Sequence, residues 1–318
     1  MEAPPEPVRE TPPPPVRVPE RIPERVPERI PDPSPVAEPT ADRTIGPPLS
    51  GSPLAVRADA LLPRERVVAF YGNPASTRMG ILGELPPEQM LARLDREVAA
   101  WQRADPATPV RPALHLITTM AAGDPGPGDL YIVRMSARRI AQVQEWAARR
   151  DALLFLDIQP GRSTVAAELP RLRQWLVQPD VHLALDPEWN MGPEGLPGRA
   201  IGSMSAREIN HAIRWLAELV DEYDLPPKIL VVHRFTQHMV LGAEDILVDP
   251  RVQVVMHMDG WGPPAQKLTT YRSIVAPEAE QFTGFKLFYK NDLRGGGRML
   301  RPEEILRLNP VPFYIQYQ

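Results

Sequence analysis

The chain contains no cysteine, so disulfide bonds, thiolate metal sites and a cysteine nucleophile are all excluded. It also lacks a run of about 18 consecutive apolar residues, so no membrane-spanning helix is expected. Positive charge is not in excess. The formal net charge over the 318 residues is −4, which argues against a nucleic-acid partner. Lysine is scarce beside arginine, which makes the closely spaced Lys286 and Lys290 noticeable.

Proline, by contrast, is abundant near the N-terminus. Residues 1–53 hold 17 of the 41 prolines, and Val18–Pro31 repeats the unit Val/Ile-Pro-Glu-Arg. Proline at every fourth position removes amide donors and prevents a helix, so this segment should be extended and polyproline-like. We expect a disordered linker over residues 1–53 that acts as a spacer. Attachment to a cell-wall or surface partner through this arm is the alternative.

The location of the protein stays open at this stage. Met1–Glu10 lacks the charged, apolar and small-residue regions of a secretory signal. We expect an extracellular or cell-envelope location if a signal has been removed, and a cytoplasmic one otherwise. The excess of arginine is read as a base-composition bias of a bacterial source genome.

Eight short apolar runs follow the linker, and each ends at a turn signal, as buried strands do. They lie at 67–73, 113–120, 153–159, 181–186, 228–235, 252–259, 283–291 and 312–318. Amphipathic stretches predict helices at 86–102, 136–150, 164–177, 205–223, 263–275 and 301–308. This alternation predicts an α/β fold, a (β/α)8 TIM-type barrel over residues 54–318. An open doubly wound sheet is the alternative.

The predicted barrel lacks the usual eighth helix, because the sequence stops at Gln318, directly after the eighth strand. Residues 54–66 are expected to cover the gap, or the gap forms an interface.

Carboxylates stand at the ends of three predicted strands, where barrel enzymes bind ligands. They are Asp157, Asp186 with Glu188, and Asp259. Strand alternation places Asp186 and Glu188 on one face. Glycoside cleavage requires such a pair, one acid to protonate the leaving oxygen and a second carboxylate to assist. We therefore predict catalytic roles for all four, with Glu188 as the acid. Without a catalytic role, Asp186 would cap the next loop and Glu188 would be solvated.

Other polar and aromatic residues fall on the same predicted strand faces or just past the strand ends. Lysines there could neutralise the carboxylates, and aromatic rings could stack on sugars. Either His233 or Arg234 should point inward, whereas His115 and His182 are read as core histidines. The predicted substrate-binding residues are Tyr71, Asn73, Gln159, Trp189, His233, Arg234, His257, Trp261, Lys286, Tyr289, Lys290 and Gln316.

No cofactor is predicted. No HxH or HExxH spacing occurs, which argues against a dedicated zinc site. A divalent ion held by Asp186, Glu188, His233 and Asp259 is the alternative that mixed Asp, Glu and His ligands leave open.

Two short motifs resemble the glycoside-hydrolase-like (β/α)8 barrel superfamily. LDPE at 185–188 is similar to the D-x-E that ends strand four in chitinase-like members, and HMDG at 257–260 is faintly similar to their strand-six motif. The resemblance implies Glu188 as general acid, Asp186 as its partner and Asp259 as a substrate-orienting carboxylate. The chain departs from that pattern because the aspartates before D-x-E and the Ser-Gly-Gly of strand three are absent.

These observations predict a hydrolase that cleaves a glycosidic bond by carboxylate acid–base chemistry at the C-terminal rim of the barrel. Its expected partner is a carbohydrate substrate. Two alternatives remain: a metal-dependent hydrolase or isomerase, and a non-catalytic carbohydrate-binding barrel at the cell surface.

Overall fold

The computed structural model describes residues 56–318. The predicted proline-rich linker at residues 1–53 lies outside the described residues. Among the described helices, none combines the length and the apolar character needed to cross a membrane.

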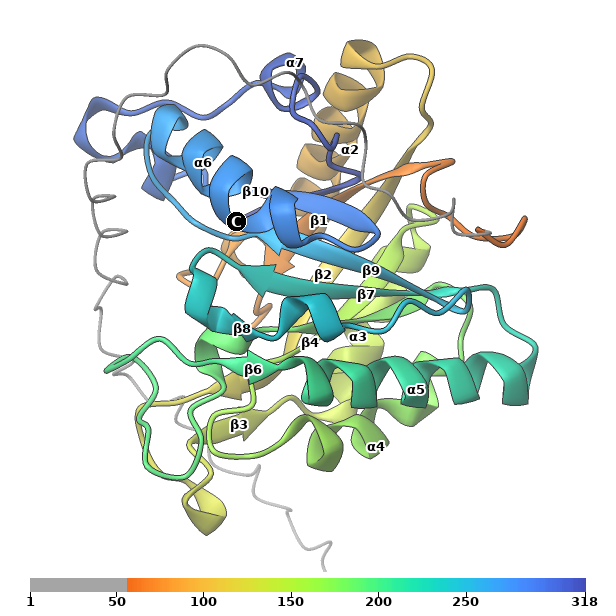
Figure 1. Ribbon diagram of the computed structural model, residues 1–318. Coiled ribbons are helices and arrows are strands. Elements are labelled where there is room, and N and C mark those ends of the chain that lie inside the picture. The colour runs from red at the N-terminus through yellow and green to blue at the C-terminus, as the bar shows by residue number, and fades with distance from the viewer. Residues whose placement is uncertain (1–55) are drawn as a thin grey trace, which may run out of the picture.

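Eight parallel strands close into a ring, so the chain forms a (β/α)8 TIM-type barrel (Figure 1). Pairing between the strands Arg66–Gly72 and Val110–Ala121 closes the ring, which excludes the open sheet. In ring order the strands are β1 (Arg66–Gly72), β11 (Tyr314–Tyr317), β10 (Phe282–Leu287), β9 (Val252–Met258), β7 (Lys228–Arg234), β5 (Val181–Leu185), β4 (Leu153–Ile158) and β2 (Val110–Ala121). Each overlaps one of the eight predicted apolar runs, although β10 ends four residues before the run predicted at 283–291 does.

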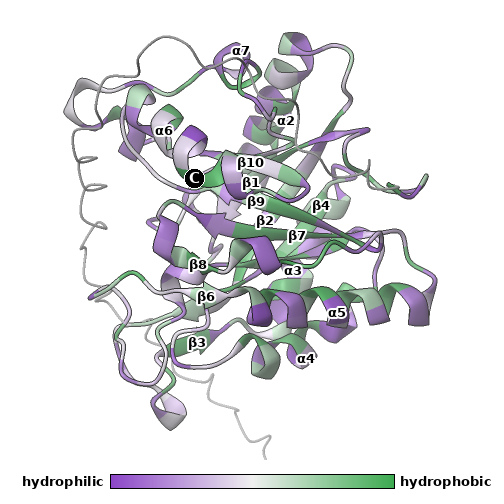
Figure 2. Ribbon diagram, in the orientation of Figure 1, coloured by the Kyte–Doolittle hydropathy of each residue, from purple (hydrophilic) through white to green (hydrophobic). Residues whose placement is uncertain are grey.

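Helices cover the outside of the barrel. The long ones are α2 (Pro87–Ala104), α3 (Ala137–Ala148), α4 (Val165–Leu176) and α5 (Ala206–Tyr223). The shorter ones are α1 (Ile81–Glu84), α6 (Pro264–Thr270), which continues as a π-helical turn over Tyr271–Val275, and α7 (Pro302–Ile305). Ser136, Thr164 and Ser205 are the N-caps of α3, α4 and α5, and the side chain of each accepts a backbone N–H of its helix. Figure 2 shows hydrophobic colour along the strands and both colours on α5, as expected for helices with one buried face.

Other short strands lie outside the ring of eight. β3 (Ile132–Arg134) pairs antiparallel with the end of β2, and β6 (Met204–Ser205) pairs with β8 (Val240–Leu241). The weakly helical stretch 236–250 contains β8 and two 3-10 turns, Gln237–Met239 and Ala243–Asp245.

Residues 57–65 close the amino-terminal end of the barrel instead of replacing the missing helix. Leu62 is fully buried in the interior cluster with Val67 and Val231. The Gln253 side chain fixes it, because its Oε1 accepts from Leu62 N (3.1 Å) and its Nε2 donates to Leu62 O (2.6 Å). On the outer side, β11 packs against α2, where Trp101 Nε1 donates to Tyr317 Oη at 3.0 Å.

The barrel interior changes in character along its axis. At the amino-terminal end it is apolar, with Val67, Ala69 and Ile229 among its residues. Further along lie Phe155 and Tyr314 with buried histidines, and carboxylates follow at the carboxyl end. This gradient places the ionisable groups beneath and around one rim.

Candidate active site

A cavity of about 220 Å³ opens at the carboxyl ends of the barrel strands. Its wall contains three of the four predicted carboxylates together with several predicted binding residues. The predicted residues that line it are Tyr71, Gln159, Asp186, Glu188, Trp189, Asp259, Trp261 and Lys286. Residues from separate strands therefore line one cavity at this rim.

Asp186 both shapes the loop and lines the cavity. Its Oδ1 accepts from Glu188 N at 3.2 Å, which begins the 3-10 turn Pro187–Trp189. That turn presents Glu188 and Trp189 to the cavity. The expected loop-capping role of Asp186 and its position in the cavity wall thus coexist.

Gln159 links the carboxylate to the opposite wall. Its Oε1 accepts from Ala121 N at 3.1 Å, which turns its Nε2 toward the cavity. There Nε2 donates to Asp186 Oδ2 at 3.3 Å and to Tyr71 Oη at 3.2 Å. The amide thereby holds Asp186 in place.

Two carboxyls in the wall bind protons more tightly than usual. Burial raises the pKa of Asp186 to about 7, and the charges of the neighbouring Asp157 and Asp259 add to the rise. Burial also raises the pKa of Glu188 well above its usual range, helped by the charges of Asp186 and Asp259. A protonated carboxyl is therefore available in this wall near neutral pH.

The raised pKa of Asp186 predicts a pH-dependent stability. Because the folded state holds the proton more tightly than the unfolded state, folding is most stabilised below the unfolded pKa and loses this contribution as the pH rises toward 7. Asp186→Asn cannot titrate. We expect the stability of Asp186→Asn relative to wild type to increase between pH 4 and 8, by at most about 4 kcal/mol. Urea unfolding at several pH values measures this difference; parallel pH profiles would contradict it.

Asp259 is held by two basic side chains. Lys286 Nζ lies 2.8 Å from its Oδ1, and His233 Nδ1 lies 2.7 Å from its Oδ2. Burial opposes ionisation of Asp259, but the charge of Lys286 and the hydrogen bond from His233 outweigh it and keep its pKa below the usual range. Lys286 Nζ also lies 3.8 Å from the centroid of the Tyr71 ring, a cation–π contact. Asp259 is thus a fixed negative charge beside the protonated carboxyls.

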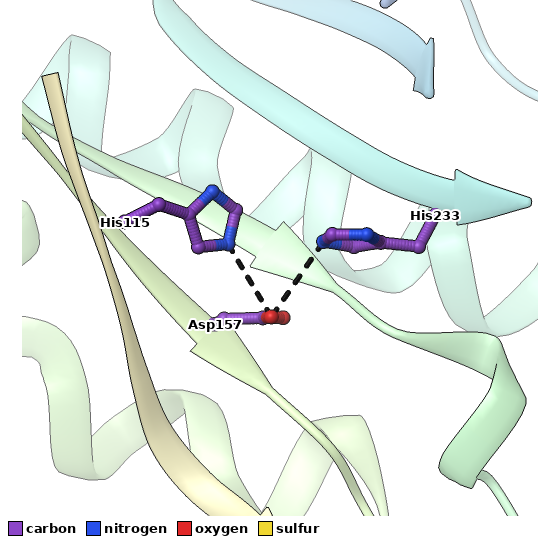
Figure 3. A group of neighbouring side chains, drawn as sticks. All are labelled: His115, Asp157 and His233. Carbon is purple, nitrogen blue, oxygen red and sulfur yellow. Dashed lines mark ion pairs between the residues drawn. The ribbon is translucent and has the colours of Figure 1, made fainter. Parts of the chain in front are cut away.

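A buried layer lies beneath the cavity. Asp157 Oδ2 is 3.3 Å from His115 Nε2 and 3.6 Å from His233 Nε2, and all three side chains are fully buried (Figure 3). Asp157 therefore does not line the cavity, which corrects the catalytic role predicted for it. Gly284 gives the layer room, because a Cβ there would lie 2.4 Å from His257 Nδ1. The ring of His257 is likewise fully buried and out of reach of a ligand in the cavity.

The histidines expected in the core are there. His115 and His182 are both fully buried, and His182 Nδ1 accepts from Ile229 N at 3.1 Å. The structure resolves the choice on β7, because His233 points inward to Asp157 and Asp259 whereas Arg234 points outward. Arg234 Nη1 lies 2.6 Å from Glu278 Oε2, so its predicted binding role is corrected to a structural ion pair.

Tyr289 and Lys290 also lie elsewhere than predicted. β10 ends at Leu287, so strand alternation does not extend to them. Tyr289 stacks on Tyr317 on the outer side of the barrel and donates to Glu97 at 2.7 Å. Lys290 is exposed and pairs with Glu84. Neither lines the cavity.

Asn73 and Gln316 are buried and serve local structure. Asn73 Oδ1 accepts from Ala75 N at 2.9 Å in the turn after β1. Gln316 Nε2 lies 2.9 Å from His115 Nδ1, inside the barrel. Their predicted contact with substrate is therefore also corrected.

Several cavity residues were not among the predicted site residues. They are Arg78, Met79, Ile117, Ala121, Phe235, Gly260, Phe288, Asn291 and Gln318. Phe288 and Gln318 each lie one position past the end of β10 or β11 and two positions after Lys286 or Gln316, so the strand alternation still reaches them. Arg78 lies on a loop and Asn291 begins the 3-10 turn Asn291–Gly296, and the sequence carries no periodic signal at either position.

One set of side chains in residues 56–318 brings three potential metal ligands together, His115, Asp157 and His233. The ligand set suggested by the sequence (Asp186, Glu188, His233 and Asp259) does not converge in this way. His233 Nδ1 is instead engaged by Asp259, and Glu188 and Asp186 face the cavity.

Comparison with known proteins does not assign the chain to a family. No protein-family model matches the chain, and no curated protein does. Among solved structures, it is similar to Thermotoga maritima Cel5A in complex with cellobiose, at 10% identity and a TM-score of 0.43, over 79% of this chain and 88% of that one. A mutant form of Cel5A in complex with cellobiose substrate has 11% identity and the same TM-score, over 80% and 87% of the two chains. Likeness at this level assigns neither substrate nor catalytic residues.

Proposed function

We propose that the protein is a hydrolase that cleaves a glycosidic bond at this rim, with Glu188 as the general acid. The observation that carries the proposal is one cavity lined by a proton-retaining carboxyl pair and an ion-paired carboxylate, with two tryptophans beside them. Carboxyl groups whose surroundings push their proton affinities apart are the arrangement from which acid and base roles arise.

The roles follow from the surroundings of each group. Glu188 keeps its proton near neutral pH and can donate it to a leaving oxygen. Asp186, with a pKa of about 7, is suited to accept a proton from water. Asp259 is kept negative by Lys286 and can stabilise positive charge on the sugar ring of an oxocarbenium-like transition state.

The size and lining of the cavity favour a ligand with one small ring in the cavity. Its volume of about 220 Å³ is below the roughly 300 Å³ at which pockets for drug-sized ligands begin. Trp189 and Trp261 stand on loops that follow different strands and both line the cavity. Arg294 lies over the Trp261 ring, 5.5 Å from its centroid, which helps to hold that ring in place. A single sugar unit would fill the cavity, and neighbouring units would extend beyond its mouth.

The tryptophans are expected to contribute to substrate binding more than to the chemical step. Trp189→Ala and Trp261→Ala should each raise KM by about 5–30-fold, the loss of about 1–2 kcal/mol of ring contact, with a smaller change in kcat. Steady-state kinetics with a glycoside that the wild-type protein hydrolyses measures both KM and kcat. Tyr223→Ala, which removes an exposed aromatic ring on α5, serves as the control. A loss in kcat with unchanged KM would argue against a stacking role.

The test of the function is hydrolysis across a panel of aryl glycosides and oligosaccharides by wild type and by Glu188→Gln. The proposal expects turnover of at least one glycoside by wild type and little by the variant. Sugar binding without hydrolysis would replace the proposal with a carbohydrate-binding barrel. If the protein neither binds nor hydrolyses any sugar of the panel, the carbohydrate assignment is overturned.

A further inference from the structure

We propose that His115, Asp157 and His233 hold a divalent metal ion inside the barrel, in the buried layer beneath the cavity. The three residues come from β2, β4 and β7, and their potential ligand atoms all lie within 4.8 Å of one another. Figure 3 shows a ring nitrogen of each histidine facing the Asp157 carboxylate. The inference does not depend on the proposed hydrolase function.

The spacing of these atoms fits ligands around an ion. Asp157 Oδ2 lies 3.3 Å from His115 Nε2 and 3.6 Å from His233 Nε2. A direct charge-assisted hydrogen bond would be shorter, about 2.7–2.9 Å. Nitrogen and oxygen ligands that are each about 2.0–2.1 Å from a tetrahedral zinc ion are roughly 3.3–3.4 Å from one another.

The same atoms are otherwise unsatisfied. Both carboxylate oxygens of Asp157 and the Nε2 atoms of His115 and His233 have no hydrogen-bond partner within residues 56–318. All three side chains are fully buried. A buried carboxylate without a donor or a cation costs several kcal/mol, whereas one bound metal ion would coordinate Asp157 Oδ2 and both histidine Nε2 atoms at once.

A histidine that binds a metal through one ring nitrogen as a rule donates its other ring N–H to a carboxylate or another acceptor. The Nδ1 atoms of both histidines have such neighbours. His233 Nδ1 lies 2.7 Å from Asp259 Oδ2, which places its proton there and leaves the Nε2 lone pair facing Asp157. His115 Nδ1 lies 2.6 Å from Tyr314 Oη and 2.9 Å from the Gln316 amide. Turning that amide over would let its Oε1, which has no partner as placed, accept from His115 Nδ1 and free Nε2 for the metal.

The competing arrangement is a doubly protonated His233 between Asp157 and Asp259. It would neutralise one carboxylate without a metal, but it leaves His233 Nε2 at 3.6 Å from its acceptor. Two imidazoles and one carboxylate suit first-row divalent ions such as zinc, iron(II) and cobalt(II). An ion there would fix the His233 tautomer that donates to Asp259, and would so couple the buried layer to the cavity.

The experiment uses the full chain after chelator treatment, titrated with Zn²⁺ for stoichiometry and with Co²⁺ for its absorption spectrum. We expect one ion per chain and a Co²⁺ spectrum of nitrogen ligation. His115→Gln and His233→Gln should bind more than about 10–100-fold more weakly, since even the loss of an outer partner costs that much. His182→Gln, a buried histidine outside the cluster, should bind as wild type does. Undiminished binding by His115→Gln would overturn the site.

A measurement on wild type alone keeps the test valid if the variants do not fold. With Co²⁺ bound, two paramagnetically shifted imidazole N–H signals are expected, one from each ligand histidine. Less than one tenth of an equivalent of bound metal, or no shifted N–H signals, would overturn the proposal. A doubly protonated His233, seen in nitrogen chemical shifts at saturating Zn²⁺, would do so as well.

Discussion

Glu188→Gln is expected to lower kcat on any glycoside that the wild-type protein cleaves by about 10²–10⁴-fold, the usual contribution of a positioned general acid. Glutamine keeps the size of the side chain and its place in the cavity wall but carries no acidic proton. Glu188 is held by the turn after β5 and makes no buried ion pair, so the fold should be retained. KM should change much less than kcat, because the proton is transferred only in the transition state.

The pH dependence of activity distinguishes an acid role of Glu188 from a merely structural one. The acid must be protonated, so wild-type activity should decline as the pH rises through the raised pKa of Glu188. Residual activity of Glu188→Gln should lack that decline. Glu194→Gln, on the exposed part of the same loop, is the matched control and should leave kcat unchanged. Wild-type rates in Glu188→Gln would remove Glu188 from the acid role.

Lys286→Met is expected to destabilise the folded protein by about 3–5 kcal/mol, because it leaves the buried Asp259 carboxylate without its ammonium partner. The Lys286 side chain is 3% exposed and that of Asp259 is 7% exposed, so both charges are almost fully removed from solvent. His233 remains as a partner for the other carboxylate oxygen. The free energy of unfolding in urea measures the loss.

The chain offers a matched control and a rescue for this prediction. Lys290 forms an ion pair with Glu84 at the same 2.8 Å separation, but its side chain is 68% exposed. Lys290→Met should therefore cost only about 0–1 kcal/mol. Lys286→Met combined with Asp259→Asn should recover part of the loss, because the unpaired charge is gone. Equal costs for the two lysine variants would contradict the importance of burial here.

The barrel could be predicted from the sequence because its strands are buried on both faces. Such strands appear as continuous Val, Ile and Leu runs, and eight of them alternate with capped amphipathic helices. The placement of Asp186, Glu188 and Asp259 at one rim follows from the same reasoning, since parallel strands all end at that rim.

The errors arise where a strand stops or where partners are distant in the sequence. Strand alternation would place Lys290 on the same face as Lys286. However, β10 ends before Lys290, and only the strand pairing in the structure reveals where it ends. Nothing local shows that Arg234 pairs with Glu278, 44 positions away. The close approach of His115, Asp157 and His233 likewise depends on three strands that meet only in the closed ring.

The most direct test of the proposed site is a crystal structure of Glu188→Gln soaked with oligosaccharides. The account predicts a sugar ring in the cavity beside Trp189 or Trp261, with a glycosidic oxygen within hydrogen-bonding distance of the amide at position 188. Sugar bound on another face, or bound in the cavity with position 188 out of reach of any glycosidic oxygen, would contradict it.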